Sequence, residues 1–186
     1  FGYGRTSGGN VSITNLVSNN GVVASNTTGV GTARFQLAAA GYGNDKVIFG
    51  YGTTGTVTAV TNLVSNAGVV ATDTTGVGTA RQGPAAAGYG SDKAIFGYGL
   101  TAAAYASITN LVSNTGVVAT DTTGVGTARY ILAAASYGSD KAIFGYGLGG
   151  GDFVSMTNLV SNTGVVANDV TGVGTARAGL AGASYG

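Results

Sequence analysis

The stretch TNLVSNTGVVATDTTGVGTAR at residues 109–129 occurs four times in this chain with small changes. The other copies lie at 14–34, 61–81 and 157–177, and only four of the 21 columns differ among them. A second block, LAAASYGSDKAIFGYG at 132–147, recurs in similar form at 37–52 and 84–99. The resulting period of 47 or 48 residues predicts an array of repeats, none of which buries a core alone.

The composition favours short strands joined by tight turns. The 186 residues include 35 Gly, 10 Tyr and one Pro, and only 8% are charged. Such a chain is too rich in Gly for helices and too rich in aliphatic and aromatic side chains for disorder. We expect a single repeat domain over 1–186, with repeats at 1–48, 49–95, 96–143 and 144–186.

Each repeat contains four segments with strand chemistry. In the third repeat the first, second and third strands are expected at 129–136, 141–146 and 153–160, and the fourth corresponds to 117–121 of the preceding copy. The turns at 137–140 and 113–116 carry the Gly, Asn, Ser and Asp residues that tight turns need. No segment shows helical spacing of apolar residues, so the fold class is all-β, built from four-stranded antiparallel units.

The order of residues in the repeat resembles the kelch family. Arg129 opens a strand of small residues, and Ile143-Phe144 leads into the glycine pair Gly145 and Gly147. The resemblance covers the whole chain, and it implies a β-propeller whose alanine-rich first strands lie nearest the axis. The ring is then expected to close by pairing of the N-terminal FGYG strand with the C-terminal strand at 177–184. The chain would form four blades, or part of a longer array, or half of a larger ring made by two copies.

Two segments of the repeat vary where the rest is nearly constant. One is the second-to-third turn, and the other is the dipeptide after each repeated Arg. In an up-and-down sheet these two connections lie at the same end, which we call the variable end. The variable end comprises residues 5–11, 53–58, 100–106 and 148–154 together with 35–36, 82–83, 130–131 and 178–179.

Aromatic, amide and charged side chains on a rigid scaffold are typical of a binding surface. The alternative is that this variation has no role in binding, because the second-to-third turns are simply the longest and least constrained part of the repeat. The candidate ligand-binding residues are Arg5, Thr6, Phe35, Gln36, Thr53, Thr54, Gln82, Leu100, Tyr105, Tyr130, Ile131, Asp152 and Phe153.

The four repeated arginines, Arg34, Arg81, Arg129 and Arg177, could form a ring that holds an anion. The alternative is that each is a structural donor to turn carbonyls or to Asp73, Asp121 and Asp169. We expect no catalytic residues, no metal site and no cofactor. The chain has no His, Cys or Glu, and its Asp residues lack the spacing of a calcium loop.

The balance of charge and the hydropathy exclude some partners. A net charge of +1 without a basic patch argues against nucleic acid, and no apolar run is long enough to insert into a membrane. We expect a non-catalytic recognition or adhesion module that binds a glycan or a surface protein, located outside cells or on a virion surface such as a phage tail. The alternatives are a structural component that assembles into a filament, sheath or capsid, and an engineered scaffold. A homo-oligomer, or a longer parent chain of which this is a piece, is expected.

Overall fold

The computed structural model describes residues 1–184, and this part of the chain contains strands and turns but no helix. The all-β prediction is therefore confirmed, and the described residues include no helix that could cross a membrane. The last expected repeat runs to 186, and its final two residues lie outside the described part. The strands are β1 (Gly2–Thr6), β2 (Gly9–Thr14), β3 (Ala38–Tyr42), β4 (Lys46–Gly50), β5 (Thr61–Val64), β6 (Ala85–Tyr89), β7 (Lys93–Leu100), β8 (Tyr105–Val112), β9 (Ala133–Tyr137), β10 (Lys141–Gly149) and β11 (Asp152–Val160).

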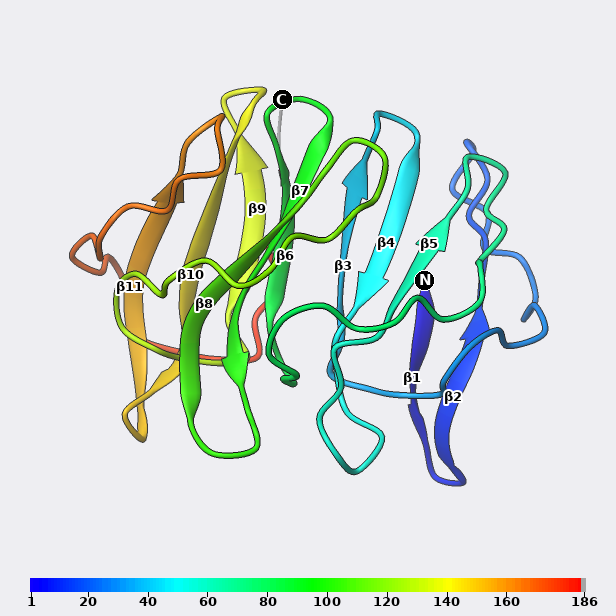
Figure 1. The fold of residues 1–186 in the computed structure, drawn as a ribbon, viewed down its shortest axis with the longest axis horizontal. Coiled ribbons are helices and arrows are strands. Elements are labelled where there is room, and N and C mark those ends of the chain that lie inside the picture. The colour runs from blue at the N-terminus through cyan, green and yellow to red at the C-terminus, as the bar shows by residue number, and fades with distance from the viewer. Residues whose placement is uncertain (185–186) are drawn as a thin grey trace.

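These strands form four small antiparallel sheets that follow one another in chain order. The sheets are β1-β2, β3-β4-β5, β6-β7-β8 and β9-β10-β11. Figure 1 shows them side by side in one row, with β2 at one end of the row and β11 at the other. The first-to-second turns contain the left-handed residues that the sequence indicated, such as Gly138 (φ 56°) and Ser139 (φ 69°).

The prediction of four-stranded units was wrong in one respect, because the sheets have two or three strands. The expected fourth strand at 117–121 runs beside β8 but forms no regular ladder with it, and the two are joined by isolated bridges such as Val112↔Val118. Ala119 N donates to the Leu111 carbonyl at 2.8 Å, and the Asn110 side-chain amide donates to the Ala119 carbonyl. The fourth segment is therefore held to the sheet by a few backbone hydrogen bonds together with a side-chain hydrogen bond.

The first strands of the three larger sheets lie against one another. β3 contacts β6, and β6 contacts β9. A methyl group added at Gly88 would lie 3.4 Å from the Ser136 hydroxyl and 3.7 Å from the Gly41 carbonyl oxygen. Small residues are needed here because neighbouring backbones approach closely, which explains the alanine-rich first strands.

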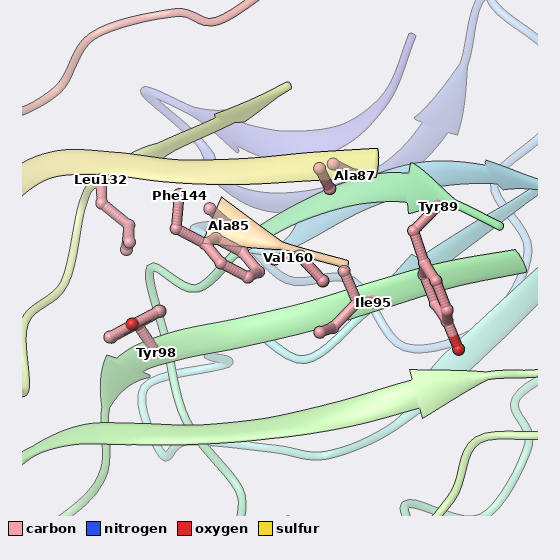
Figure 2. Close-up of a cluster of buried hydrophobic side chains, with 9 residues drawn as sticks. Ala85, Ala87, Tyr89, Ile95, Tyr98, Leu132, Phe144 and Val160 are labelled. Atoms are coloured by element: carbon pink, nitrogen blue, oxygen red, sulfur yellow. The ribbon is translucent and has the colours of Figure 1, made fainter. Parts of the chain in front are cut away.

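Each sheet packs on the next through a phenylalanine and a glycine. Phe96 and Phe144 are fully buried, and a methyl group added at Gly97 would lie 2.6 Å from the Phe144 ring. Figure 2 shows the cluster around this contact, with Phe144 and Val160 of the last sheet beside Ala85 and Ile95 of the preceding one. Burying such rings removes apolar surface from water at about 25 cal/mol per Å², so the core consists of these junctions between sheets.

The tyrosine of the G-Y-G motif occupies a β-bulge. Tyr98 has a φ of 62° and Tyr146 a φ of 63°, and the register of β7 and β10 shifts at these residues. The bulge turns the tyrosine ring toward the next sheet, where Tyr98 meets Phe144 edge to face at 5.2 Å. Left-handed tyrosines cost conformational energy, but here that energy is offset by packing and by the carbonyl contacts described below.

The expected closure by pairing of the FGYG strand with 177–184 is not present in residues 1–184. β1 pairs with β2, and residues 177–184 form no strand. Gly182 instead lies beside β9, where an added methyl group would approach the Ala134 carbonyl oxygen to 2.8 Å. The last first-strand segment therefore continues the row of β3, β6 and β9, and the sheets β1-β2 and β9-β10-β11 lie at opposite ends of the row (Figure 1).

Candidate functional site

The second-to-third hairpins carry the first set of variable residues to one end of the array. β7 and β8 stay paired up to Leu100↔Tyr105, and β10 and β11 up to Gly149↔Asp152. In Figure 1 the tips of the β1–β2, β7–β8 and β10–β11 hairpins lie along the lower edge of the molecule. The first-to-second turns lie along the upper edge, so the structure separates a variable end from a constant end.

The variable dipeptides join these hairpins through short bridges. Gln82 pairs with Leu100, Tyr130 with Leu148, and Phe35 with Thr53. The dipeptides at 82–83 and 130–131 therefore lie beside β7 and β10, and the dipeptide at 35–36 lies beside the residues that follow β4. This confirms the prediction that the two variable sets share one end. Antiparallel backbone hydrogen bonds hold the dipeptides beside the residues that lead into the hairpins.

Consecutive dipeptides are also hydrogen-bonded to one another. Gly83 N donates to the Gln36 carbonyl at 2.8 Å, Ile131 N to the Gly83 carbonyl at 3.0 Å, and Gly179 N to the Ile131 carbonyl at 2.9 Å. Gln36 and Ile131 adopt left-handed φ values of 53° and 45°. A β-branched residue such as Ile131 rarely adopts this conformation, so the hydrogen bonds hold a strained backbone at the variable end.

Aromatic and cationic side chains contact each other on this surface. The Tyr105 and Tyr130 rings are stacked, with centroids 5.3 Å apart and planes inclined by 17°. The Arg5 guanidinium lies over the Phe35 ring at 5.2 Å. Phe153 is 61% exposed and so presents an apolar face to solvent. Such preformed aromatic groups can take up a ligand at little cost in conformational entropy.

The candidate residues differ in their exposure. Arg5, Thr6, Gln36, Thr54, Asp152 and Phe153 are exposed, whereas Phe35, Gln82, Leu100, Tyr105, Tyr130 and Ile131 are half-buried. Thr53 is buried, so it presents no surface to a ligand and instead accepts a hydrogen bond from Gly55 N at 3.1 Å. The burial of Thr53 follows from its bridge to Phe35, which the sequence did not reveal.

Three of the four repeated arginines are enclosed between sheets. Arg34, Arg81 and Arg129 are fully buried, and each donates three hydrogen bonds to protein acceptors. Arg81 donates to the Tyr98 carbonyl at 2.7 Å, to the Thr79 carbonyl at 3.0 Å and to Asn110 Oδ1 at 2.7 Å, and it lies 3.9 Å over the Tyr51 ring. These groups already have protein partners, which favours the structural role over an anion ring.

Arg177 differs from the other three because it is exposed. Its guanidinium donates to the Thr175 carbonyl at 2.9 Å and lies 4.2 Å over the Tyr146 ring. Arg129 donates to the Tyr146 carbonyl and to Asn158 Oδ1, which lie 17 and 29 residues further along the chain. Within residues 1–184, Arg177 makes no such hydrogen bonds.

Burial between neighbouring sheets shifts the pKa values of several side chains. Burial lowers the pKa of Arg81, and the facing Tyr51 opposes that change. Burial raises the pKa of Tyr98 to about 12, although the nearby Arg129 charge acts in the opposite direction. Burial also tends to raise the pKa of Asp121, but hydrogen bonds from Thr79 and Asn110 outweigh it and the net pKa is lowered.

The sequence indicated turn carbonyls and aspartates as structural partners of the arginines, and the carbonyl hydrogen bonds are present, but it did not identify the asparagines that also accept from the guanidinium groups. Asn62, Asn110 and Asn158 accept from the guanidinium groups and donate to Asp73, Asp121 and Asp169 respectively. The available signal was their invariance among the repeats, which implied a shared environment but no particular partner.

A hollow of about 210 Å³ with a mixed polar and apolar lining lies away from the variable end. It is lined at the first-to-second turns by residues that include Tyr42, Tyr89, Lys93 and Ser136. These residues are nearly constant among the repeats, so sequence variation did not point to them. In residues 1–184 no three side chains of the His, Cys, Asp and Glu types are grouped as a metal site.

Comparison with protein-family models and with curated protein sequences found no match to this chain.

Proposed function

We propose that the chain is a non-catalytic recognition module whose variable end binds a glycan or a surface protein. In this proposal the repeats are kelch-like blades of a β-propeller, and the protein acts outside cells or on a virion surface. The observation that carries the proposal is that most of the sequence variation among the repeats lies at one end of the sheets. The turns at the other end are nearly constant.

The contacts at the variable end support binding in two ways. The stacked Tyr105 and Tyr130 rings and the exposed Phe153 offer apolar faces on which a sugar ring or an aromatic side chain can stack. Arg5, Gln36 and Asp152 are exposed on the hairpins and dipeptides of the same variable end and can donate or accept hydrogen bonds. The chain of backbone hydrogen bonds from Gln36 to Gly179 holds these groups in place before a target arrives.

The test replaces Tyr105, Tyr130 and Phe153 together by Ala and measures binding to a glycan panel and to intact host cells. We expect binding of the unaltered protein to at least one target and a loss of roughly 100-fold or more in the triple variant, because aromatic anchors each contribute about 1–3 kcal/mol. Tyr137→Ala is the matched control, since Tyr137 is an exposed tyrosine at the constant end.

The circular-dichroism spectrum of the triple variant should stay that of the unaltered protein, because none of the three side chains is fully buried. Equal loss of binding in the Tyr137→Ala control, or undiminished binding of the triple variant, would contradict the proposal. A protein that binds no member of either panel would contradict it as well.

A second candidate function is a structural component that assembles with copies of itself. One observation favours it: the same valine of each repeat is largely exposed, at 66% for Val22, 66% for Val69, 65% for Val117 and 66% for Val165. Apolar side chains repeated along one surface are typical of surfaces that meet another protein.

A further inference from the structure

The hollow of about 210 Å³ lies where three consecutive first-to-second turns meet. These turns join β3 to β4, β6 to β7 and β9 to β10 along the upper edge of the molecule in Figure 1. Neighbouring turns are hydrogen-bonded, because Gly43 N donates to the Asp92 carbonyl at 2.6 Å and Gly90 N to the Asp140 carbonyl at 2.7 Å. All the lining residues lie within 41–139, in the interior of the chain, and we call this site the turn hollow.

The same position of each turn contributes a polar side chain to the turn hollow. Asn44, Ser91 and Ser139 each have a φ of 69°, so the backbone presents the three side chains in the same way. Within residues 1–184 these exposed side chains make no hydrogen bond to a protein group, whereas the nearby Ser136 hydroxyl donates to the Gly88 carbonyl at 2.9 Å. Glycine would adopt this φ without strain, so the hydrogen-bonding side chains are kept at some conformational cost.

Lys93 gives the turn hollow a positive group. It is the one charged residue among those that line the hollow in the described part of the chain. Its ammonium donates to Asp92 Oδ1 at 2.7 Å, and this hydrogen bond raises the pKa of Lys93, so the group is charged at neutral pH. An ammonium group has three hydrogens, so two of them remain for a ligand.

The partner carboxylate is turned to other groups. Asp92 accepts from Lys93 through Oδ1 and from the Asn114 side chain through Oδ2 at 3.0 Å, and it is not one of the lining residues. The side chains at the turn hollow therefore offer a surplus of donors, one of them cationic. Asp92 offsets part of the Lys93 charge, so we expect binding of modest affinity.

We propose that the turn hollow binds a small oxyanion of the sulfate or phosphate type, either free or carried on a larger ligand. In the complex, the Lys93 ammonium and the Ser91 and Ser139 hydroxyls donate hydrogen bonds to the anion oxygens, and the Asn44 amide can add another. Hydrogen bonds from a cation to an oxyanion are roughly twice as strong as those between neutral groups.

The size of the turn hollow agrees with a ligand group of this kind. Sites for drug-sized molecules span about 300–1,000 Å³, and the turn hollow is smaller. It has room for several water molecules, each of which takes up about 30 Å³ in the liquid. The apolar part of the lining can contact the carbon atoms of a carrier such as a sugar.

The turn hollow is separate from the variable end. Its residues belong to the first-to-second turns, and the variable residues lie on the opposite edge of the sheets (Figure 1). The variant in which Tyr105, Tyr130 and Phe153 are all replaced by Ala should therefore bind the anion like the unaltered protein. Failure of target binding at the variable end and failure of anion binding can thus be told apart.

The test is a nuclear magnetic resonance titration of the whole chain with inorganic sulfate, with sodium chloride adjusted to keep the ionic strength constant. We expect saturable shifts of the backbone amides of Asn44, Ser91 and Ser139. Lys93→Met should weaken binding by at least about 10-fold, because it removes the cationic donor. Ser139→Ala should weaken it by about 3-fold, because it removes a neutral donor.

Lys46→Met is the matched control. Lys46 occupies the same position in its turn and donates to Asp45 at 2.7 Å, but it does not line the turn hollow. Its side chain is 40% exposed and that of Lys93 is 42% exposed, so both variants should remain folded. Sulfate binding by Lys46→Met should equal that of the unaltered protein.

Two further titrations distinguish a free anion from one on a carrier. Glucose 6-sulfate should produce the same amide shifts as sulfate, and tighter binding than sulfate would show that a carrier is recognised as well. Unsulfated glucose should produce none, and equal shifts with glucose would overturn the proposal. Equal weakening by Lys46→Met and Lys93→Met would overturn it too, as would the absence of saturable shifts with both sulfate and glucose 6-sulfate.

Discussion

Arg81→Met is expected to destabilise the fold far more than the same change at Arg177. Both arginines occupy the same position in the repeat, but Arg81 is fully buried and Arg177 is exposed. Methionine fills much of the space of the arginine stem and carries no charge, so the comparison isolates the guanidinium group.

The magnitude follows from the contacts that each guanidinium makes. Loss of the Arg81 group leaves the buried Tyr98 carbonyl and Asn110 Oδ1 without their donor, at about 1–3 kcal/mol for each, and removes a part-buried hydrogen bond to the Thr79 carbonyl. Loss of the cation–π contact with Tyr51 adds about 2 kcal/mol to the destabilisation. Because the variant no longer buries a charge, part of this destabilisation is offset. The net loss is about 3–5 kcal/mol for Arg81→Met.

Arg177→Met removes one hydrogen bond to the Thr175 carbonyl and an exposed contact with Tyr146, so we expect a loss below about 1 kcal/mol. Urea unfolding followed by far-ultraviolet circular dichroism measures both variants against the unaltered chain. The measurement is made at a protein concentration at which a single chain predominates, so that association does not contribute. Losses that agree within about 1 kcal/mol would refute the structural role assigned to the buried arginines.

Three further predictions concern the junctions. Gly97→Ala should lower the free energy of unfolding by about 1–3 kcal/mol in the same urea assay, since the added methyl group would lie 2.6 Å from the Phe144 ring; an unchanged midpoint would contradict this packing. Because the pKa of Asp121 is lowered in the fold, its carboxylate stabilises the protein above the ordinary aspartate pKa of about 3.9, and this contribution is lost as the pH falls through the lower folded value. Asp121→Asn should therefore reduce the loss of stability in acid, and an identical profile of stability against pH would show that this carboxylate does not contribute. Because the pKa of Tyr98 is raised to about 12 in the fold, its neutral hydroxyl contributes stability below the ordinary tyrosine pKa of about 10, and this contribution is lost as the pH rises toward 12. An ultraviolet titration of Tyr98→Phe should show one fewer tyrosine that ionises late, and an unchanged titration curve would be evidence against the burial of this hydroxyl.

The local features of this fold could be predicted from the sequence. Turn residues and the alternation of bulky and small side chains act over a few neighbours, so β10 and β11 begin at or next to the expected residues 141 and 153. Because antiparallel strands alternate direction, the order of turns alone was enough to predict that Leu100 and Gln82 share one end.

Features that depend on distant partners could be decided only by the tertiary structure. The burial of Arg81 depends on acceptors 17 and 29 residues away, and the burial of Thr53 on its bridge to Phe35. The three-stranded sheets and the open row of sheets likewise depend on packing between repeats. Nearly identical repeats gave no indication that the Asn110 amide links Arg81 to Asp121, because that contact depends on which side chains the packed sheets bring together.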